Sequence, residues 1–116
     1  NADSANKLSF QNKRSSGGYN IARSSVNVND NTWYFFVVTS DRALSGDNET
    51  KVYINGNLSL VVQNNLDTTG NFINDILFIG QRAGTSLGFN GSLMKYQAFR
   101  DVPTDAQAME MYQNDL

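Results

Sequence analysis

The sequence predicts an all-β fold, an antiparallel β-sandwich that is closed by one short helix near the C-terminus. Turn signals recur at short, regular intervals between apolar runs, which is typical of sandwiches and barrels. Charged residues make up only 17% of the chain. The polarity comes instead from Asn, Ser, Thr and Gly, which suit surface strands and turns better than exposed helices. Only the last segment has a helical period.

The length of the chain fits one hydrophobic core. A chain of 116 residues buries roughly two-thirds of its unfolded surface, which is enough for one core. We therefore treat residues 1–116 as a single domain. Because the first residue is Asn1 rather than Met, we interpret this domain as a fragment of a larger protein.

The first quarter of the chain predicts a β-hairpin and one further strand. Residues 7–11 alternate between apolar and polar side chains, and residues 15–18 read Ser-Ser-Gly-Gly. Residues 19–23 are then the return strand of the hairpin. Residues 26–30 are short and alternating, and they predict another strand.

The central strand is predicted at residues 32–40. Every residue from Trp33 to Val38 is apolar or aromatic. A continuous run of this length, rich in β-branched and aromatic types, indicates a strand that is covered on both sides. We therefore expect these side chains to lie in the core.

A second hairpin follows a polar loop. Residues 50–54 and 57–62 are strand-like, and Asn55-Gly56 lies between them. Asn-Gly predicts a two-residue turn because both turn positions need a positive φ. Two more strands are predicted, at residues 75–79 and 92–99.

The last segment predicts a helix over residues 103–113. Thr104 is placed to act as the N-cap, and Gln107 stands at the N3 position of a capping box. Three apolar residues then fall on one face, which can pack against the sandwich. These residues are Ala108, Met111 and Tyr112.

Six short motifs follow one another in order after residue 32. They are the Trp-led strand at 33–41, Lys-Val-Tyr-Ile-Asn-Gly at 51–56, Leu-Phe-Ile-Gly at 77–80, Phe-Asn-Gly at 89–91, the strand at 92–99 and Val-Pro-Thr-Asp-Ala at 102–106. From Trp33 to Tyr112 this order resembles the laminin-G-like, concanavalin A-like jelly-roll modules. The resemblance implies a jelly-roll sandwich, of which this chain is the C-terminal part.

The sequence departs from that family pattern in two ways. The family corner is usually followed by an acidic pair, but Met94-Lys95 stands at that place here. Such sandwiches also carry several more strands before the Trp-led strand than this chain supplies. The missing strands could lie in an upstream segment, come from another chain or domain of the parent protein, or be dispensed with in a minimal version.

The composition excludes several classes of function. The chain has no cysteine and no histidine, which removes disulfides, thiolate or imidazole metal sites and the Ser-His-Asp triad. A net charge of −2 gives no electrostatic footprint for nucleic acid. No stretch is long and apolar enough for membrane insertion. The Glu-x-Asp-x-x-Glu pattern of related glycoside hydrolases is missing, so we do not expect an enzyme.

One loop is a candidate calcium site. Residues 40–49 concentrate oxygen-bearing side chains of the kind that Ca²⁺ prefers. The candidate ligands are Asp41, Asp47, Asn48 and Glu49. Related modules often hold Ca²⁺ at the rim of the sandwich. The alternative is an ordinary solvated hairpin loop.

The glycine-rich segment at residues 80–91 is first of all a corner between strands, because its glycines permit positive φ values. It could also supply contacts to a ligand through Arg82, Thr85, Phe89 and Asn90. Carbohydrate is the ligand class that fits best, since sugars bind aromatic faces together with amides, carboxylates and hydroxyls. Tyr19 and Phe89 are the aromatic residues nearest to predicted turns, whereas Trp33, Tyr53 and Tyr96 are expected to pack within strands.

These observations together predict a non-catalytic binding or adhesion module. Its expected partner is a glycan or a cell-surface receptor, and its expected location is extracellular or on a virion or cell surface. The alternatives are a purely structural capsid or fibre decoration domain and an accessory domain of a polysaccharide-degrading enzyme.

Overall fold

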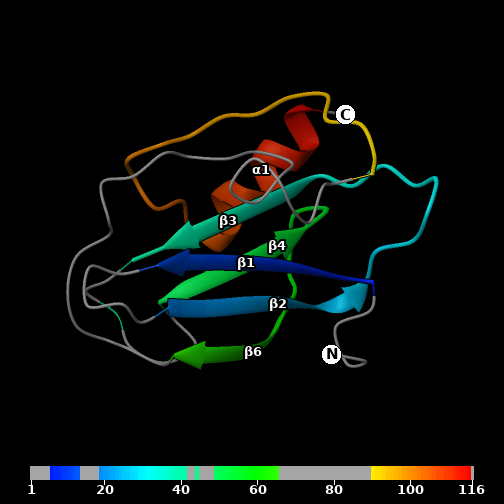
Figure 1. Cartoon of the computed structure of the whole chain (residues 1–116). Coiled ribbons are helices and arrows are strands. Elements are labelled where there is room, and N and C mark those ends of the chain that lie inside the picture. Colours follow the sequence, from blue (N-terminus) through cyan, green and yellow to red (C-terminus); the bar gives the residue numbers. More distant parts are fainter. Residues whose placement is uncertain (1–5, 14–18, 42–43, 45–48, 66–89, 116) are drawn as a thin grey trace.

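The computed structural model describes residues 6–13, 19–41, 44, 49–65 and 90–115 (Figure 1). Within these residues the chain forms six strands and one helix. The elements are β1 (Lys7–Lys13), β2 (Tyr19–Asn27), β3 (Phe36–Ser40), β4 (Thr50–Ile54), β5 (Asn57–Leu58), β6 (Leu60–Asn65) and α1 (Asp105–Asn114).

The strands form two antiparallel sheets of three strands each. The strand order is β1-β2-β6 in the first sheet and β3-β4-β5 in the second. The chain passes from one sheet to the other at Ser59, which lies between β5 and β6 and is 4% exposed. Its N–H donates to the Val52 carbonyl of β4 at 2.8 Å, and its carbonyl accepts from the Ser25 N–H of β2. The predicted all-β sandwich with a C-terminal helix is therefore confirmed.

The two predicted hairpins are present, with some differences at their ends. β1 pairs with β2, and the turn predicted at residues 15–18 lies outside the described residues. The strand predicted at 26–30 is not a separate element, because β2 runs on to Asn27. At the second hairpin, Asn55 and Gly56 have φ values of 50° and 78°. This is the turn that the Asn-Gly pair predicts.

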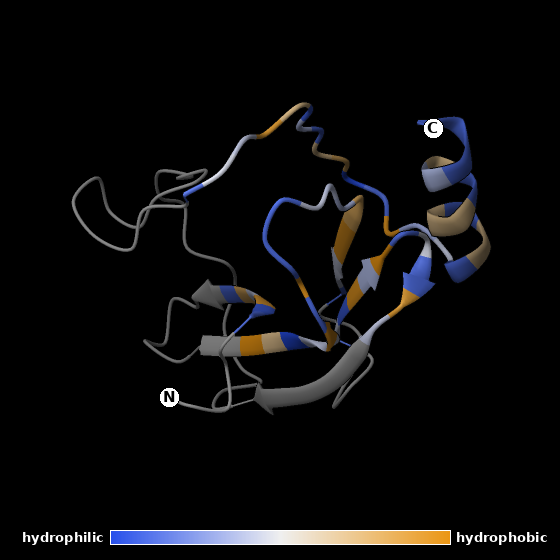
Figure 2. Cartoon of the chain, turned by 90° about the vertical axis from the view of Figure 1, so that its right-hand side faces the viewer, coloured by the Kyte–Doolittle hydropathy of each residue, from blue (hydrophilic) through white to orange (hydrophobic). Residues whose placement is uncertain are grey.

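β4 is the strand of the second sheet that is covered on both faces. On one face, Val52 and Ile54 pack with Ala22 of β2 and so contact the first sheet. On the other face, Tyr53 is 1% exposed and bonds to Asp105 of α1. Figure 2 shows the helix on one side of this sheet and the N-terminal strands on the other. The core therefore centres on β4.

The expectation that residues 33–38 form the doubly covered strand is wrong. β3 begins only at Phe36, which is 46% exposed, and Trp33 is 64% exposed. Tyr34 and Phe35 are half-buried, and Phe35 contacts the Tyr112 ring of α1 at 5.8 Å between centroids. The physical reason is position in the sheet: among the described strands, β4 has a neighbour on each side, whereas β3 has one only.

Two further strand predictions need correction. The strand predicted at residues 57–62 is divided at Ser59 into β5 and the start of β6, because the chain changes sheets there. The strand predicted at 92–99 does not form, and residues 90–102 are exposed throughout. An extended segment becomes a strand only when its backbone groups find partners, and no described strand pairs with this one. The strand predicted at 75–79 lies outside the described residues.

The helix prediction is confirmed in detail. α1 begins after Thr104, whose side chain accepts from the Gln107 N–H at 3.3 Å. The Gln107 side chain in turn accepts from the Thr104 N–H at 2.9 Å, which completes the capping box. Ala108 is buried, and Met111 and Tyr112 are half-buried. Across the described ranges, no helix is long and apolar enough to span a membrane.

Candidate functional site

The predicted ligand contacts are only partly visible. Tyr19 is the first residue of β2, where its backbone stands opposite Lys13 of β1. Asn90 is exposed at the start of the last described segment. Arg82, Thr85 and Phe89 lie outside the described residues, so the predicted corner site remains a prediction.

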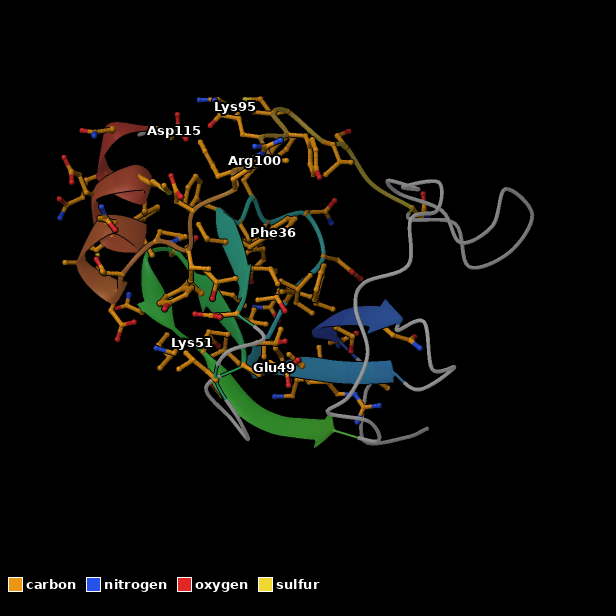
Figure 3. All side chains as sticks on the ribbon, turned by 90° about the vertical axis from the view of Figure 1, so that its left-hand side faces the viewer. Phe36, Glu49, Lys51, Lys95, Arg100 and Asp115 are labelled. Atoms are coloured by element: carbon orange, nitrogen blue, oxygen red, sulfur yellow. The ribbon has the colours of Figure 1, made fainter. Side chains whose placement is uncertain are left out.

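Two of the four predicted calcium ligands are brought together. Asp41 and Glu49 face each other where β3 and β4 meet the connecting loop, and the Asp41 N–H donates to the Glu49 carbonyl at 2.7 Å. Glu49 is 2% exposed, and Figure 3 shows it at the end of the sheet opposite Phe36. Asp47 and Asn48 lie outside the described residues. Among the residues that the structure does describe, no group of three or more acidic side chains could hold a metal ion.

A polar cluster fixes the start of α1 against β4. The Tyr53 hydroxyl donates to Asp105 Oδ1 at 2.7 Å, and Lys51 Nζ lies 3.4 Å from the same oxygen. Burial raises the pKa of the Tyr53 hydroxyl well above its usual value, and its bond to Asp105 adds to this rise. The hydrogen bond from Tyr53, followed by Lys51, holds the pKa of Asp105 below its usual range. These contacts position the first turn of the helix.

With α1 held in place, the segment before it borders an open hollow of about 190 Å³. The hollow lies between residues 99–103 and the side of the helix that carries Gln107 and Met111. Its lining residues are Phe99, Arg100, Asp101, Val102, Pro103, Gln107 and Met111. Figure 3 shows Arg100 on the same side of the molecule as Lys95 and Asp115. Lys95 bridges to Asp115 at 2.8 Å, which ties this exposed segment to the end of α1.

The hollow combines an aromatic ring with polar groups. Phe99 is 60% exposed, so its ring is accessible from solvent. The guanidinium of Arg100 donates hydrogen bonds, the carboxylate of Asp101 accepts them, and Gln107 carries an amide. An aromatic face beside such donors and acceptors is an arrangement that can hold one polar ring with apolar C–H patches.

Sequence reasoning missed these residues. The sequence pattern predicts Phe99 inside a strand and assigns Trp33 and Tyr96 to packing. The structure leaves Trp33 64% and Tyr96 54% exposed. The available signal was the Arg100-Asp101 pair, which ends the apolar pattern just before the helix and indicates a solvent-facing segment.

The chain matches one family model over almost its whole length. The model, described as the concanavalin A-like lectin/glucanases superfamily, matches residues 1–109. This match confirms the resemblance and extends it to the N-terminal residues. The search of curated proteins found no match.

A solved structure has a similar fold. It is the 2.1 Å crystal structure of an S-layer domain-containing protein (residues 221–444) from Clostridium thermocellum ATCC 27405, with a TM-score of 0.51 and 16% sequence identity. The alignment covers 95% of this chain and 64% of that one. At this identity the similarity concerns the fold alone, and the present chain spans about two-thirds of the neighbour's length.

Proposed function

The chain belongs to the concanavalin A-like lectin/glucanase superfamily, and from this premise we propose that it is a non-catalytic binding module for glycans. A glycan-bearing cell-surface receptor is the natural carrier of such a ligand. The hollow beside α1 is the observation that supports this proposal, because it presents the exposed Phe99 ring next to Arg100, Asp101 and Gln107.

A single sugar ring that stacks on one aromatic face in the hollow would bind weakly. Covering one ring face removes roughly 50 Å² of apolar area, which is worth about 1 kcal/mol. The hydrogen bonds of the polar groups add selectivity, since they replace bonds to water. A site of this strength becomes effective when several copies act together.

The proposed lack of catalysis rests on the carboxylates. Glycoside hydrolases use two acidic groups that flank the scissile bond. The two glutamates of the chain are Glu49 and Glu110. Glu49 is buried beside the β3–β4 loop, whereas Glu110 is exposed on α1. These two glutamates lie on different elements and differ in burial, so they do not suit the two flanking roles, which agrees with a binding function.

The proposed location is the cell exterior or a virion or cell surface. The similar structure comes from an S-layer domain-containing protein, and lectin-type modules meet their glycans outside the cell. The module would then be one part of a larger surface protein. Ca²⁺ at Asp41, Asp47, Asn48 and Glu49 is a further part of this proposal.

A glycan array, followed by titration of the best ligand, tests the proposal. Phe99→Ala should weaken binding at least several-fold, because it removes the stacking face. Val26→Ala is the matched control, since Val26 is 47% exposed on β2 in the other sheet. It should bind like the wild type. Repeating both titrations with EDTA would show whether a metal ion contributes.

The second candidate is a structural spacer in a surface assembly. The similar S-layer protein fold favours it as the alternative. An array without any binding, with and without Ca²⁺, would reject the glycan proposal and favour the spacer. Binding that Phe99→Ala and Val26→Ala affect equally would place the glycan elsewhere on the molecule.

A further inference from the structure

The capping box decides which hydrogen-bonding groups Gln107 can offer to the hollow beside α1. Gln107 Oε1 accepts from the Thr104 N–H at 2.9 Å and from the Thr104 hydroxyl at 3.1 Å. Both lone pairs of this oxygen are thereby used. The Nε2 group of the same amide has no partner in the part of the chain that the structure describes. Because an amide NH₂ can only donate, Gln107 brings a donor to the hollow and no acceptor.

The two charged residues of the hollow are also available to a ligand. Arg100 and Asp101 are exposed, and neither side chain has an ion pair or a hydrogen bond within the described ranges. Lys95, the other basic residue of residues 90–102, is already paired with Asp115 at 2.8 Å. Arg100 supplies donors only, whereas an ionised Asp101 only accepts. Their charges cancel, so the hollow favours neither an acidic sugar, which Asp101 repels, nor an amino sugar, which Arg100 repels.

The rest of the lining is apolar. It consists of Phe99, Val102, Pro103 and Met111. Phe99 and Val102 are 60% and 44% exposed, and Met111 is half-buried. The hollow therefore sets donors, one carboxylate acceptor and apolar surface side by side. The complement of such a lining is an uncharged group that carries an acceptor, a donor and a methyl close together.

We propose that the hollow recognises N-acetylated sugars by their acetamido group, an inference that rests on the proposed glycan-binding function. The acetamido carbonyl has two lone pairs and accepts from Gln107 Nε2 and from the Arg100 guanidinium. The acetamido N–H donates to the Asp101 carboxylate. Its methyl group contacts the apolar lining at Met111, while the sugar ring stacks on Phe99. A plain hydroxyl in the same place has no methyl to bury.

NMR titration with matched monosaccharides tests this specificity. N-acetylglucosamine, glucose and protonated glucosamine differ at one ring carbon, which carries an acetamido, a hydroxyl or an ammonium group. N-acetylglucosamine should bind about ten-fold more tightly than glucose, because it adds a buried methyl and further hydrogen bonds. Glucosamine should bind no better than glucose, because its positive charge meets Arg100.

Two variants of the hollow test the assigned contacts. Gln107→Glu keeps an acceptor for Thr104, since glutamate also serves a capping box, but it removes the donor. It should lower the preference for N-acetylglucosamine over glucose several-fold, a ratio that a general loss of structure would leave unchanged. Asp101→Ala removes the acceptor without breaking a contact of the described structure, and it should lower the same ratio. Gln113→Glu, the same change at an exposed position of α1 outside the hollow, should retain the wild-type preference.

The outcomes separate this inference from the proposed function. Equal binding of glucose and N-acetylglucosamine, with both weakened by Phe99→Ala, overturns the acetamido specificity and leaves the glycan site in place. A preference that survives both Gln107→Glu and Asp101→Ala also overturns it. If no sugar binds, either on the array or in the titration, the inference and the proposed function fail together.

Discussion

At position 56 the chain needs glycine for two independent reasons. The first is the turn, since Gly56 has a φ of 78°, a conformation that side chains disfavour. The second is the helix, because a Cβ at Gly56 would stand 2.7 Å from Sδ and 3.1 Å from Cα of Met109. The first reason can be inferred from the Asn-Gly pair. The second depends on where α1 docks.

Gly56→Ala should therefore destabilise the fold clearly. The positive φ alone costs a side-chain-bearing residue about 1–2 kcal/mol, and displacement of Met109 adds to this. Gly91→Ala is the matched control, because Gly91 is exposed and is not among the described residues with positive φ. Urea titration measures both changes. Equal and small effects of the two substitutions would contradict the close approach of hairpin and helix.

Tyr53 and Asp105 link the sheet to the helix through one hydrogen bond of 2.7 Å. The pKa of Asp105 is lowered in the folded state, mainly by this bond. Because this pKa is lower in the folded state, the ionised carboxylate stabilises the fold at pH values above the unfolded-state pKa of about 3.9. This contribution is lost as the pH falls through the folded value.

Tyr53→Phe should lower stability near neutral pH, and the difference from the wild type should shrink below about pH 4. The reason is that acid protonates Asp105 and removes the advantage that the wild type has. Thermal unfolding between pH 3 and 7 measures the effect. Tyr34→Phe is the control, since the Tyr34 hydroxyl accepts from the Asn29 N–H and contacts no carboxylate in the described structure. A Tyr53→Phe deficit that is constant down to pH 3 would argue against the link.

At the scale of whole elements, β3 and β4 differ in how far they are buried. β3 contains the second half of the apolar run Trp33–Val38, yet among the described strands it has a neighbour on one side only. β4 also contains polar residues, namely Thr50, Lys51 and Tyr53. Even so, Val52, Tyr53 and Ile54 are all buried. Burial thus follows the number of neighbours of a strand rather than its hydrophobicity.

A pair of truncations checks this order. Val52→Ala should cost about 2 kcal/mol, because Val52 is fully buried between the two sheets. Trp33→Ala should cost about 1 kcal/mol or less despite the larger side chain, because Trp33 is 64% exposed. Urea titration gives both values. A larger loss for Trp33→Ala would show that the Trp-led segment is the core strand after all.

At the scale of the whole molecule, each end of the second sheet has a different chemistry. Phe36 and Arg100, which lines the hollow beside α1, lie toward one end, and Glu49 lies at the other (Figure 3). A glycan site and a calcium site would therefore be separate. They can be tested one at a time.

Added Ca²⁺ in the millimolar range should raise the melting temperature, since a ligand that binds only the folded state stabilises it. Glu49→Gln should remove this increase, because Ca²⁺ prefers charged oxygen ligands. Asp30→Asn, at an exposed position outside the loop, should retain it. Melting curves with Ca²⁺ and with EDTA provide the measurement. No change in the wild type would rule out calcium at this loop.

The features that the sequence predicts correctly are those whose conformation depends on residues close together along the chain. The Asn55-Gly56 turn, the bounds of β4 and the capping box of Thr104 and Gln107 all came out as expected. Each depends on φ preferences or on hydrogen bonds between residues three apart. The candidate site could not be predicted in this way, because Phe99 and Arg100 line a hollow only when α1 lies against them.

The amino-acid order alone therefore specifies an all-β chain with two hairpins and a capped helix, since these features are local. Which strand occupies the centre, which aromatic rings stay in solvent and where the hollow forms are properties of the assembled molecule. They depend on contacts such as Tyr53 with Asp105, 52 positions apart, and Phe35 with Tyr112. No pattern of neighbouring residues encodes such contacts, because burial depends on what packs against a side chain from elsewhere in the chain.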